Sequence, residues 1–263
     1  MIAIAVAFER EIEDYLIAGG FRSVENHDRL RFYLSPTIRD VVVVTGGCGP
    51  QLSSEAAKLV IEKYHPKLLL SVGYAAGAMP DMVPGDVFVC KKLMSLAGEA
   101  LYWGADTVLE KQVAESVLPY DQWNDIDVRW GSCITIPMLV SGSSMKEWLG
   151  INFDVDLIDM ESYGISEVAE ARGIPELIIR GVFDPMEQTL PLFVAQSLHD
   201  SVTRTAIRAA SYTIAHPFSF RSTLALKDQA KRVTESLSLF LNQVTCTGEL
   251  ADAIDLSAVV AAS

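Results

Sequence analysis

The sequence predicts an α/β fold, because short apolar runs typical of strands alternate with longer segments of helical periodicity. Glycine-rich turns follow several of the apolar runs, and two of the predicted strands lead to acidic residues. In an open α/β sheet, ligands bind in the crevice beyond the carboxyl ends of the strands. The pattern therefore predicts a site for a polar ligand at one edge of a sheet.

Composition limits the classes of protein to which the chain can belong. Its 263 residues suffice for one large α/β domain or two small ones. Half of the residues are hydrophobic and 21% are charged, which provides for a substantial core. The formal net charge of −13 argues against nucleic-acid binding, which depends on basic surface.

The apolar run Ile2–Phe8 is far shorter than the roughly 18 to 20 residues of a membrane-spanning helix. Charged residues follow it in place of a cleavage site, so we expect a buried first strand, no integral membrane segment and a cytoplasmic location. Cys48, Cys90, Cys133 and Cys246 are too scattered to suggest a metal site. We expect buried thiols of a reducing compartment.

The predicted elements follow in order along the chain. Strands are predicted over Ile2–Phe8, Val41–Thr45, Lys67–Gly73, Gly85–Lys91, Cys133–Ser141 and Asp154–Met160. A helix is predicted from about Ser53 to Tyr64, with Ser53 or Ser54 as its cap. A second helix includes Ile165 and Arg172 and ends at Gly173.

The strand Glu176–Val182 comes next, with Asp184 at its carboxyl end. After Pro191 the chain turns helical, with an apolar stripe at Val233, Leu237, Phe240, Leu241 and Val244. We therefore predict a single domain over 1–245, with a helical C-terminal part from about residue 192. Residues 246–263 are rich in Ala and Ser and are predicted to form a loosely ordered tail.

Three glycine-rich turns are candidates for ligand binding. The backbone N–H groups of Gly47 and Gly49 could hold an anion or a ribose hydroxyl. Gly73, followed by Tyr74 and Ala75, lets the backbone approach a ligand closely. The third turn is Val140–Ser144. Strand-to-helix turns also use glycine for geometry alone, so each signal is weak by itself.

Two carboxylates stand out by position. Glu161 is expected at the start of a helix and Asp184 at the end of the following strand. Both could converge on a reactive substrate in the crevice of the sheet. The alternative is structural, because Asp often serves turns and Glu is favourable at a helix N-terminus.

Taken in order, seven short segments resemble the nucleoside phosphorylase superfamily, and within it the methylthioadenosine/S-adenosylhomocysteine nucleosidases. They are Ala7–Glu11, Gly47–Gly49, Ser71–Gly77, Pro84–Val87, Leu139–Gly142, Asp159–Glu161 and Arg180–Asp184. The end of the chain, with Asp184-Pro185, Thr189–Pro191 and a helical tail after His216-Pro217, resembles the hopanoid-associated branch. Members of that branch are thought to remove adenine from adenosylhopane.

The resemblance implies a three-layer α/β/α fold around a central mixed, partly closed sheet, assembled as a homodimer or higher homo-oligomer. It implies cleavage of the N-glycosidic bond of a purine nucleoside, most simply the hydrolytic release of adenine from a 5′-modified adenosine. No metal or organic cofactor is expected. Inorganic phosphate would be the co-substrate if the chain is a phosphorylase.

The resemblance also assigns roles to residues. Asp184 would be the general acid near the purine N7, which requires burial to raise its pKa. Glu161 would accept hydrogen bonds from the ribose hydroxyls, Met160 would pack against the ribose, and Glu11 would activate water. Arg180 could bind phosphate, orient Glu11 or pair with a nearby acid, of which we favour the partner of Glu11.

Adenine would lie over a loop near Ser143, Ser144 and Met145, with Phe183 as a further stacking surface. Two residues depart from the family. Phe183 stands where Ser or Thr is usual beside the acid, and Tyr74 stands where a small residue lines the site. These departures put the substrate in doubt and leave open a noncatalytic nucleoside-binding protein.

Hydrolysis is favoured over phosphorolysis by the turn after the first strand. It carries Glu9 and Glu11 with only Arg10 between them, and negative charge opposes phosphate binding. The alternatives are a purine nucleoside phosphorylase and a cleaver of another nucleoside such as futalosine. The two glutamates could also simply begin a solvated helix.

Overall fold

Ten strands form one mixed β-sheet in the computed structural model, which describes residues 1–97, 100–103, 126–191, 194 and 220–246. The strands are β1 (Ile2–Val6), β2 (Arg22–His27), β3 (Leu30–Leu34), β4 (Val41–Thr45), β5 (Leu68–Gly77), β6 (Val87–Ala97), β7 (Ala100–Trp103), β8 (Val128–Thr135), β9 (Leu157–Asp159) and β10 (Glu176–Asp184). The helices are η1 (Glu9–Ile12), α1 (Glu13–Ala18), α2 (Pro50–Tyr64), α4 (Ser143–Phe153), α5 (Ser162–Arg172) and α8 (Phe220–Cys246).

The sheet closes on itself over half of its width. Its strand order is β10-β6-β8-β9-β5-β1-β4-β3-β2, with β7 beside β6. β10 pairs antiparallel with β6 and parallel with β5, so β5, β9, β8, β6 and β10 form a ring. The remaining strands extend from β5 as an open sheet. The mixed, partly closed sheet expected from the sequence is thereby confirmed.

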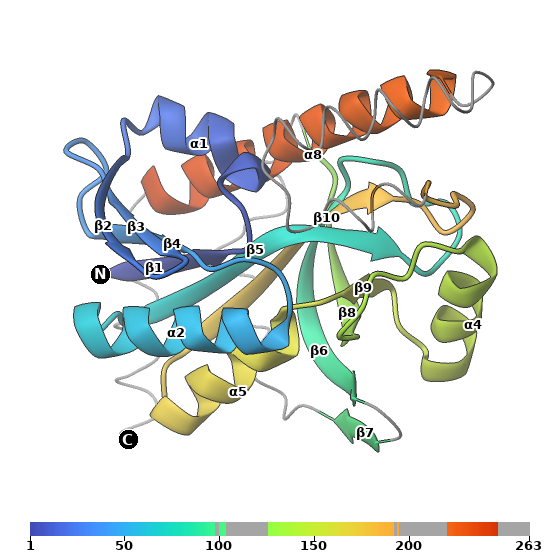
Figure 1. Ribbon diagram of the computed structural model, residues 1–263, viewed down its shortest axis with the longest axis horizontal. Helices are drawn as coiled ribbons and strands as arrows, with labels where there is room; N and C mark the ends of the chain where they lie inside the picture. The colour runs from blue at the N-terminus through green and yellow to red at the C-terminus, as the bar shows by residue number, and fades with distance from the viewer. Residues whose placement is uncertain (98–99, 104–125, 192–193, 195–219, 247–263) are drawn as a thin grey trace.

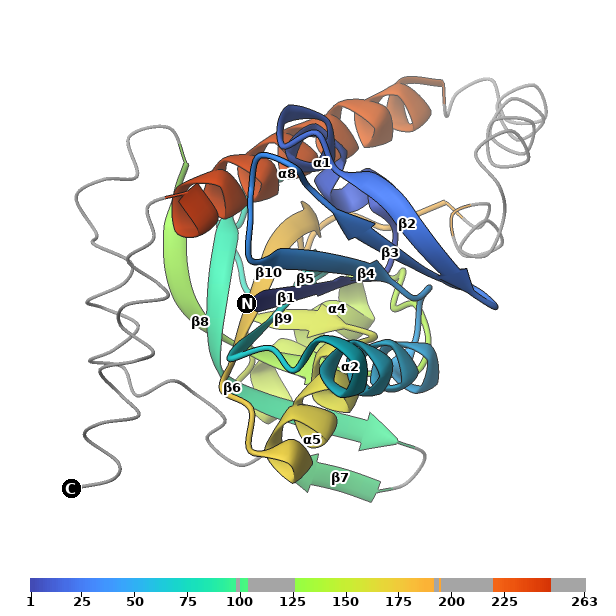
Figure 2. The ribbon, with the colours of Figure 1, turned by 90° about the vertical axis from the view of Figure 1, so that its left-hand side faces the viewer.

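Helices cover both faces of this sheet and give three layers (Figure 1). Alternate residues of β1 serve opposite faces, as the period of a strand requires. Ile2, Ile4 and Val6 belong to the core beneath α1 and α8, whereas Ala3 and Ala5 belong to the core beneath α2 and α5. Figure 2 shows α8 and the pair α2 and α5 on opposite sides of the strands.

Several predicted boundaries are corrected. The strand predicted over Cys133–Ser141 is β8, which ends at Thr135; Pro137 follows, and proline cannot donate to a sheet ladder. The predicted turn Gly73–Gly77 instead continues β5, because it pairs with β10 and β9. The helix predicted from Ser53 begins at Pro50, which needs no N–H partner in a first turn.

The caps predicted for that helix are also wrong. Ser53 and Ser54 lie inside α2, and both hydroxyls donate to the Pro50 carbonyl, at 3.0 and 2.7 Å. Gly49 occupies the N-cap position with a φ of 104°, a backbone conformation that favours glycine. The β2–β3 hairpin, β7, α1 and α4 are elements that the sequence did not predict.

The last helix bears out the predicted apolar stripe. Val233, Leu237, Phe240, Leu241 and Val244 are all buried against the sheet. The approach is close, because a Cβ added at Gly181 of β10 would lie 2.5 Å from Val233 Cγ1. Of the helical part predicted from residue 192, the segment from Phe220 on is α8, whereas residues 192–193 and 195–219 lie outside the described residues, as do residues 247–263 of the predicted tail.

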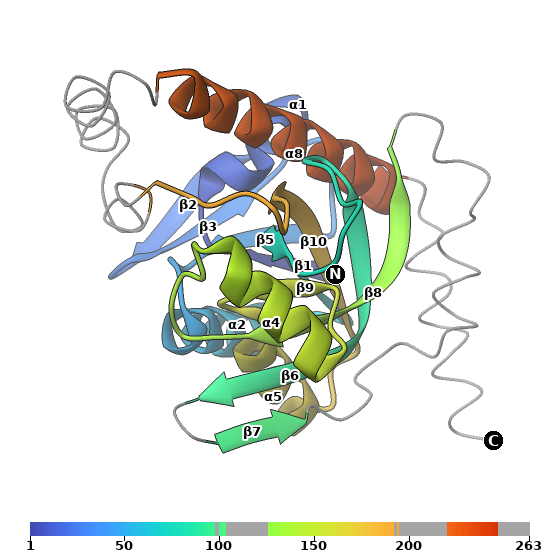
Figure 3. The same cartoon turned by 90° about the vertical axis from the view of Figure 1, so that its right-hand side faces the viewer.

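α4 lies across the end of β5 and β9, at the edge where the ring of strands opens (Figure 3). It sits so close that a Cβ at Gly150 would collide with the Ala78 carbonyl oxygen.

Among the described residues, no helix combines the length and the apolar character needed to cross a bilayer. Cys48, Cys90 and Cys133 are buried free thiols, as expected, and the side chain of Cys246 is not described.

The packing of α8 predicts a contrast between two leucines of the same helix. Leu237 is fully buried, whereas Leu239 is 47% exposed. We expect Leu237→Ala to lower the free energy of unfolding by about 2 to 5 kcal/mol, through lost burial and a cavity. Leu239→Ala should change it by no more than about 0.5 kcal/mol. Urea unfolding measures both, and equal losses would show that α8 does not pack as described.

Candidate active site

A cavity of about 590 Å³ opens at the carboxyl ends of β5, β9 and β10, beneath α8. This is the position, beyond the carboxyl ends of the strands, at which the sequence predicts a ligand site. Its walls bring together segments from the whole length of the chain. They include Phe8, Glu11, Cys48, Tyr74, Ala75, Leu139, Val140, Met160, Glu161, Phe183, Asp184, Leu190, Val194, Leu226, Ala230 and Thr234.

Asp184 lines this cavity from the last position of β10, and only 3% of the residue is exposed. Burial raises the pKa of its carboxyl group to about 7, against the lowering influence of Lys146. The side chain can therefore carry a proton near neutral pH, which is the property required of a general acid.

Lys146 is the partner that the sequence analysis missed. Its side chain is fully buried, and its Nζ forms an ion pair with Asp184 Oδ2. A lysine in the sequence reads as a surface residue, because lysine is almost never fully buried unless it is paired. Its neighbours Met145 and Trp148 are themselves exposed, so the local sequence holds no signal of its burial.

Glu11 reaches the cavity from η1 and is also buried, at 6% exposure. Its carboxylate accepts hydrogen bonds from the Phe8 N–H at 2.9 Å and the Tyr74 N–H at 3.3 Å. Burial raises the pKa of Glu11, while these two N–H groups lower it. The interpretation of both glutamates as a solvated helix start fits only Glu9, whose side chain is 43% exposed and pairs with Arg31 at 2.7 Å.

Glu161 stands at the N-cap of α5, and its carboxylate is tied to the glycine turn. Oε1 accepts the Gly49 N–H at 2.8 Å, and Oε2 accepts the Met160 N–H at 3.3 Å. Burial raises the pKa of Glu161 to about 7. The Gly47 N–H donates to the Ala7 carbonyl at 2.9 Å. The turn predicted to bind an anion thus holds the carboxylate of Glu161 itself.

Met160 is half-buried and faces the cavity rather than the core. Its sulfur lies 3.5 Å from Cys48 Sγ, so two soft side chains form one wall next to Glu161. Burial, and then the charge of Glu161, raise the pKa of the Cys48 thiol. This thiol therefore stays neutral.

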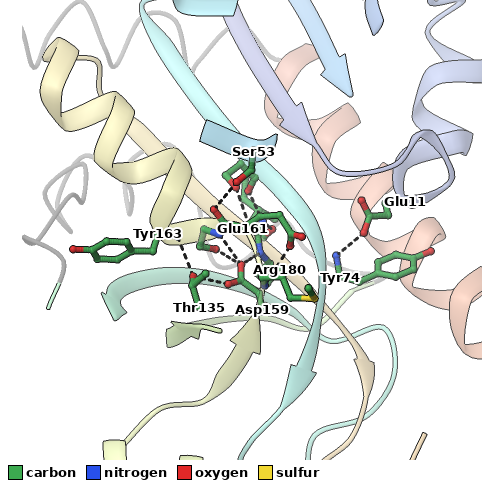
Figure 4. A network of polar contacts seen from close by, with 12 residues as sticks. Glu11, Ser53, Tyr74, Thr135, Asp159, Glu161, Tyr163 and Arg180 are labelled. Carbon is green, nitrogen blue, oxygen red and sulfur yellow. Dashed lines mark hydrogen bonds and ion pairs between the residues drawn. The ribbon is translucent and has the colours of Figure 1, made fainter. Parts of the chain in front are cut away.

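Arg180 does not contact Glu11, so the favoured expectation is wrong. Its Nε donates to Asp159 Oδ2 at 2.7 Å, and its other nitrogens donate to the Ser71 and Ile179 carbonyls and to Ser71 Oγ. Asp159 also accepts from Thr135 Oγ1 at 2.7 Å (Figure 4). The guanidinium is buried in this network, which is the structural pairing with a nearby acid.

Tyr74 and Phe183 form a second wall by stacking on each other, with ring centroids 5.4 Å apart and planes 1° from parallel. The Tyr74 hydroxyl lies 2.6 Å from Thr234 Oγ1 and donates to the Ala230 carbonyl at 3.2 Å. Both partners of the hydroxyl belong to α8. The two aromatic departures from the family pattern therefore pack as a pair and connect the sheet to the last helix.

Two expected contacts lie outside the cavity. Ser144 and Met145 are exposed in the first turn of α4, so the predicted adenine loop is a helix start that faces away. The reason is Lys146, whose inward direction turns its two predecessors outward on the helix. Gly73 lies behind Glu11, and a Cβ there would be 3.6 Å from Glu11 Oε1. Ala75 lines the cavity as expected.

Acidic side chains outnumber basic ones along the walls. The charged residues that line the cavity are Arg10, Glu11, Glu13, Asp14, Asp159, Glu161, Asp184, Lys227, Lys231 and Glu235. Within the part of the chain that the structure describes, no three His, Cys, Asp or Glu side chains gather as a candidate metal site. The arrangement can hold a neutral polar ligand and exchange protons with it.

The sequence and the structure are similar to those of known proteins. The chain is 23% identical over 223 residues to a 5′-methylthioadenosine/S-adenosylhomocysteine nucleosidase of Listeria monocytogenes, covering 78% of this chain and 95% of that protein. The structure superposes on the same type of nucleosidase from Campylobacter jejuni with a TM-score of 0.68 at 18% identity, covering 94% and 98% of the two chains.

A second solved structure, the futalosine hydrolase of Helicobacter pylori, gives a TM-score of 0.67 at 16% identity and covers 94% of this chain and 97% of its own. These likenesses show a shared fold. The family model described as the phosphorylase superfamily matches residues 1–215, which is most of the sequence. The chain therefore belongs to the phosphorylase superfamily.

Proposed function

We propose that this protein hydrolyses the N-glycosidic bond of a 5′-modified adenosine and releases adenine. The observation that carries the proposal is one cavity lined by Asp184, Glu11 and Glu161, with burial raising the pKa of each carboxyl group. Similarity to nucleosidases supports the same reaction. Buried acids with raised pKa values are typical of groups that donate and accept protons in catalysis.

The reaction divides the work among the three acids. Asp184 donates its proton to a nitrogen of the leaving adenine, which takes the electron pair of the breaking bond. The ribose becomes oxocarbenium-like and positively charged, as in other glycoside cleavages. Glu161, already seated on the Gly49 N–H, accepts hydrogen bonds from the ribose hydroxyls. Glu11 takes a proton from the water that adds to the anomeric carbon.

Hydrolysis is supported over phosphorolysis because the groups that could bind phosphate already bind carboxylates of the protein. Arg180 is bonded to Asp159, and the Gly49 N–H is bonded to Glu161. Neither is free to hold phosphate without displacing a carboxylate. Arg10 remains at the cavity, but it lies over the Phe8 ring at 4.7 Å and beside Glu11. Negative charge at this end opposes an anionic co-substrate.

The 5′ substituent would extend toward α8. Leu190, Leu226, Val194 and Ala230 give this part of the cavity an apolar wall. This supports a 5′ group with hydrocarbon character, as in methylthioadenosine or in the adenosylhopane substrates of the branch that the end of the chain resembles.

Asp184→Asn should abolish the release of adenine from methylthioadenosine, because an amide cannot donate the acidic proton. The expected loss of kcat is about 100-fold or more. Chromatographic detection of free adenine, with and without inorganic phosphate, measures it. Asp154→Asn, at the exposed C-cap of α4, is the matched control. Turnover that requires phosphate would make the protein a phosphorylase, and nucleoside binding without free base would make it a binding protein.

Glu11→Gln should also remove hydrolysis, because glutamine cannot accept the proton of the attacking water. Glu9→Gln is its matched control, two residues away on the exposed side of η1 and outside the cavity. We expect kcat to fall about 100-fold or more for the first change and to stay near wild type for the second. Equal activity of the two variants would exclude Glu11 as the base.

The pH profile of kcat/KM should be bell-shaped with its maximum near 7. Activity is lost as pH rises through the Asp184 pKa of about 7, because the acid must carry its proton. It is lost as pH falls through the raised pKa of Glu11 and through that of Glu161, about 7, because both must be ionised. Steady-state rates of adenine release measure the profile. A rate that stays level far into the alkaline range would contradict Asp184 as the acid.

A further inference from the structure

Lys146 is the feature of the site that the proposed reaction does not yet use. It lies in the first turn of α4, where Met145 and Glu147 on either side are exposed, and yet its own side chain is fully buried. Burying an ammonium group is costly unless it is paired and hydrogen-bonded. The fold therefore retains a buried charge at a helix position where an apolar residue is usual, and its partners must compensate for the loss of water.

The ammonium group is completely satisfied. It contacts Asp184 Oδ2 and donates to the carbonyls of Pro185, at 3.0 Å, and Gln188, at 2.8 Å. A lysine has three donors and no acceptor, so these three partners use its whole capacity. The two carbonyls belong to the turn that directly follows Asp184, which the Gln188 N–H closes onto the Pro185 carbonyl at 3.1 Å.

Lys146 acts from behind Asp184. Asp184 lines the cavity, whereas Lys146 does not, and no part of the Lys146 side chain is exposed. A ligand in the cavity can therefore touch the aspartate but not the lysine. Among the described residues, Lys146 is the side chain bonded to this carboxylate, and it takes Oδ2. Phe183, the neighbour of Asp184, offers a ring and no hydrogen-bond donor.

We propose that Lys146 is the positioning residue of the acid: it fixes the Asp184 carboxyl group through Oδ2 and stabilises the carboxylate that remains after proton transfer. This inference rests on the proposed hydrolysis. The proton passes from Asp184 to the base nitrogen, the base leaves with the bonding electrons, and the water proton goes to Glu11. Asp184 then becomes an anion in a buried place, where the lysine charge is most effective.

The charge of Lys146 should change the pKa of Asp184 in a direction that can be measured. Burial raises the pKa of Asp184 and Lys146 lowers it, so that the outcome is about 7. The other charged groups on the cavity are Arg10, Glu11, Glu13 and Asp14 from η1 and α1, Asp159 and Glu161 between β9 and α5, and Lys227, Lys231 and Glu235 from α8. Without the lysine charge, Asp184 would hold its proton to higher pH and donate it less readily.

The test compares full-length wild type with Lys146→Met, Lys146→Gln and Lys146→Arg, using adenine release from methylthioadenosine as a function of pH. For Met and Gln, the basic limb of kcat should move up by about one to three pH units, as expected for loss of a neighbouring opposite charge. At pH 7, kcat should fall roughly 10- to 100-fold with little change in KM. Arg keeps the charge and should keep the limb of wild type.

Two controls separate positioning from a structural role. Lys146→Gln retains N–H groups for the Pro185 and Gln188 carbonyls, so it carries the test if Lys146→Met does not fold. Lys58→Met, on the exposed surface of α2, repeats the same chemical change away from the site and should leave the profile unchanged. Carboxyl-carbon NMR of Asp184, assigned with Asp184→Asn, reports the same pKa change without turnover.

The outcomes distinguish this inference from the function on which it rests. If wild type is active and the neutral variants keep its basic limb and its Asp184 titration, Lys146 is structural and the inference is overturned. If wild type releases no base from any 5′-modified adenosine, the proposed hydrolysis is overturned and the inference with it. A shifted limb in Met and Gln, with rescue by Arg, supports both.

Discussion

The buried ion pair between Arg180 and Asp159 is the constraint on which the site depends. A buried guanidinium needs acceptors for its donors, and here four hydrogen bonds reach Asp159 on β9, Ser71 on β5 and the backbone of β10 itself. Three strands of the closed part of the sheet are thereby held at fixed spacing. Removing one partner of such a pair leaves an uncompensated charge and costs about 3 to 5 kcal/mol. Because the charge of Asp159 is paired with Arg180, the carboxyl groups that can act on a ligand from the ends of β9 and β10 are those of Glu161 and Asp184.

Local sequence patterns predicted the elements whose apolar residues are clearly marked along the chain. β4 and β10 are buried along almost their whole length, so their apolar runs identify them without tertiary information. The stripe on α8 likewise follows from helical periodicity. Glu161 and Asp184 could be singled out because carboxylates after strands and at helix starts converge on one edge of an α/β sheet, whereas Glu11 followed from the family resemblance; all three line the cavity.

The remaining elements carry signals that local patterns do not resolve. All six residues of β2 are exposed, so no alternation marks it as a strand. α4 turns Met145, Trp148 and Ile151 outward and buries Lys146, which reverses the usual relation between polarity and position. The partners of Lys146 lie about 40 residues away, and two are backbone carbonyls that have no signature in a sequence. For Arg180 the predicted partner, Glu11, is wrong. Several acids are possible partners in the sequence, and it is the pairing of β9 with β8 that brings Asp159 to the guanidinium.

The contact of Tyr74 with Thr234 has a consequence for how the protein is made. The N-terminal segment supplies Glu11, β10 supplies Asp184, and α8 closes the wall through Thr234, whose hydroxyl also donates to the Arg10 carbonyl at 2.9 Å. During synthesis the first strand leaves the ribosome long before the last helix does. A nascent chain therefore exposes the apolar side of its sheet, with its acids still solvated, until α8 emerges. The cavity is complete only once the final helix has docked, so until then the chain depends on protection from aggregation.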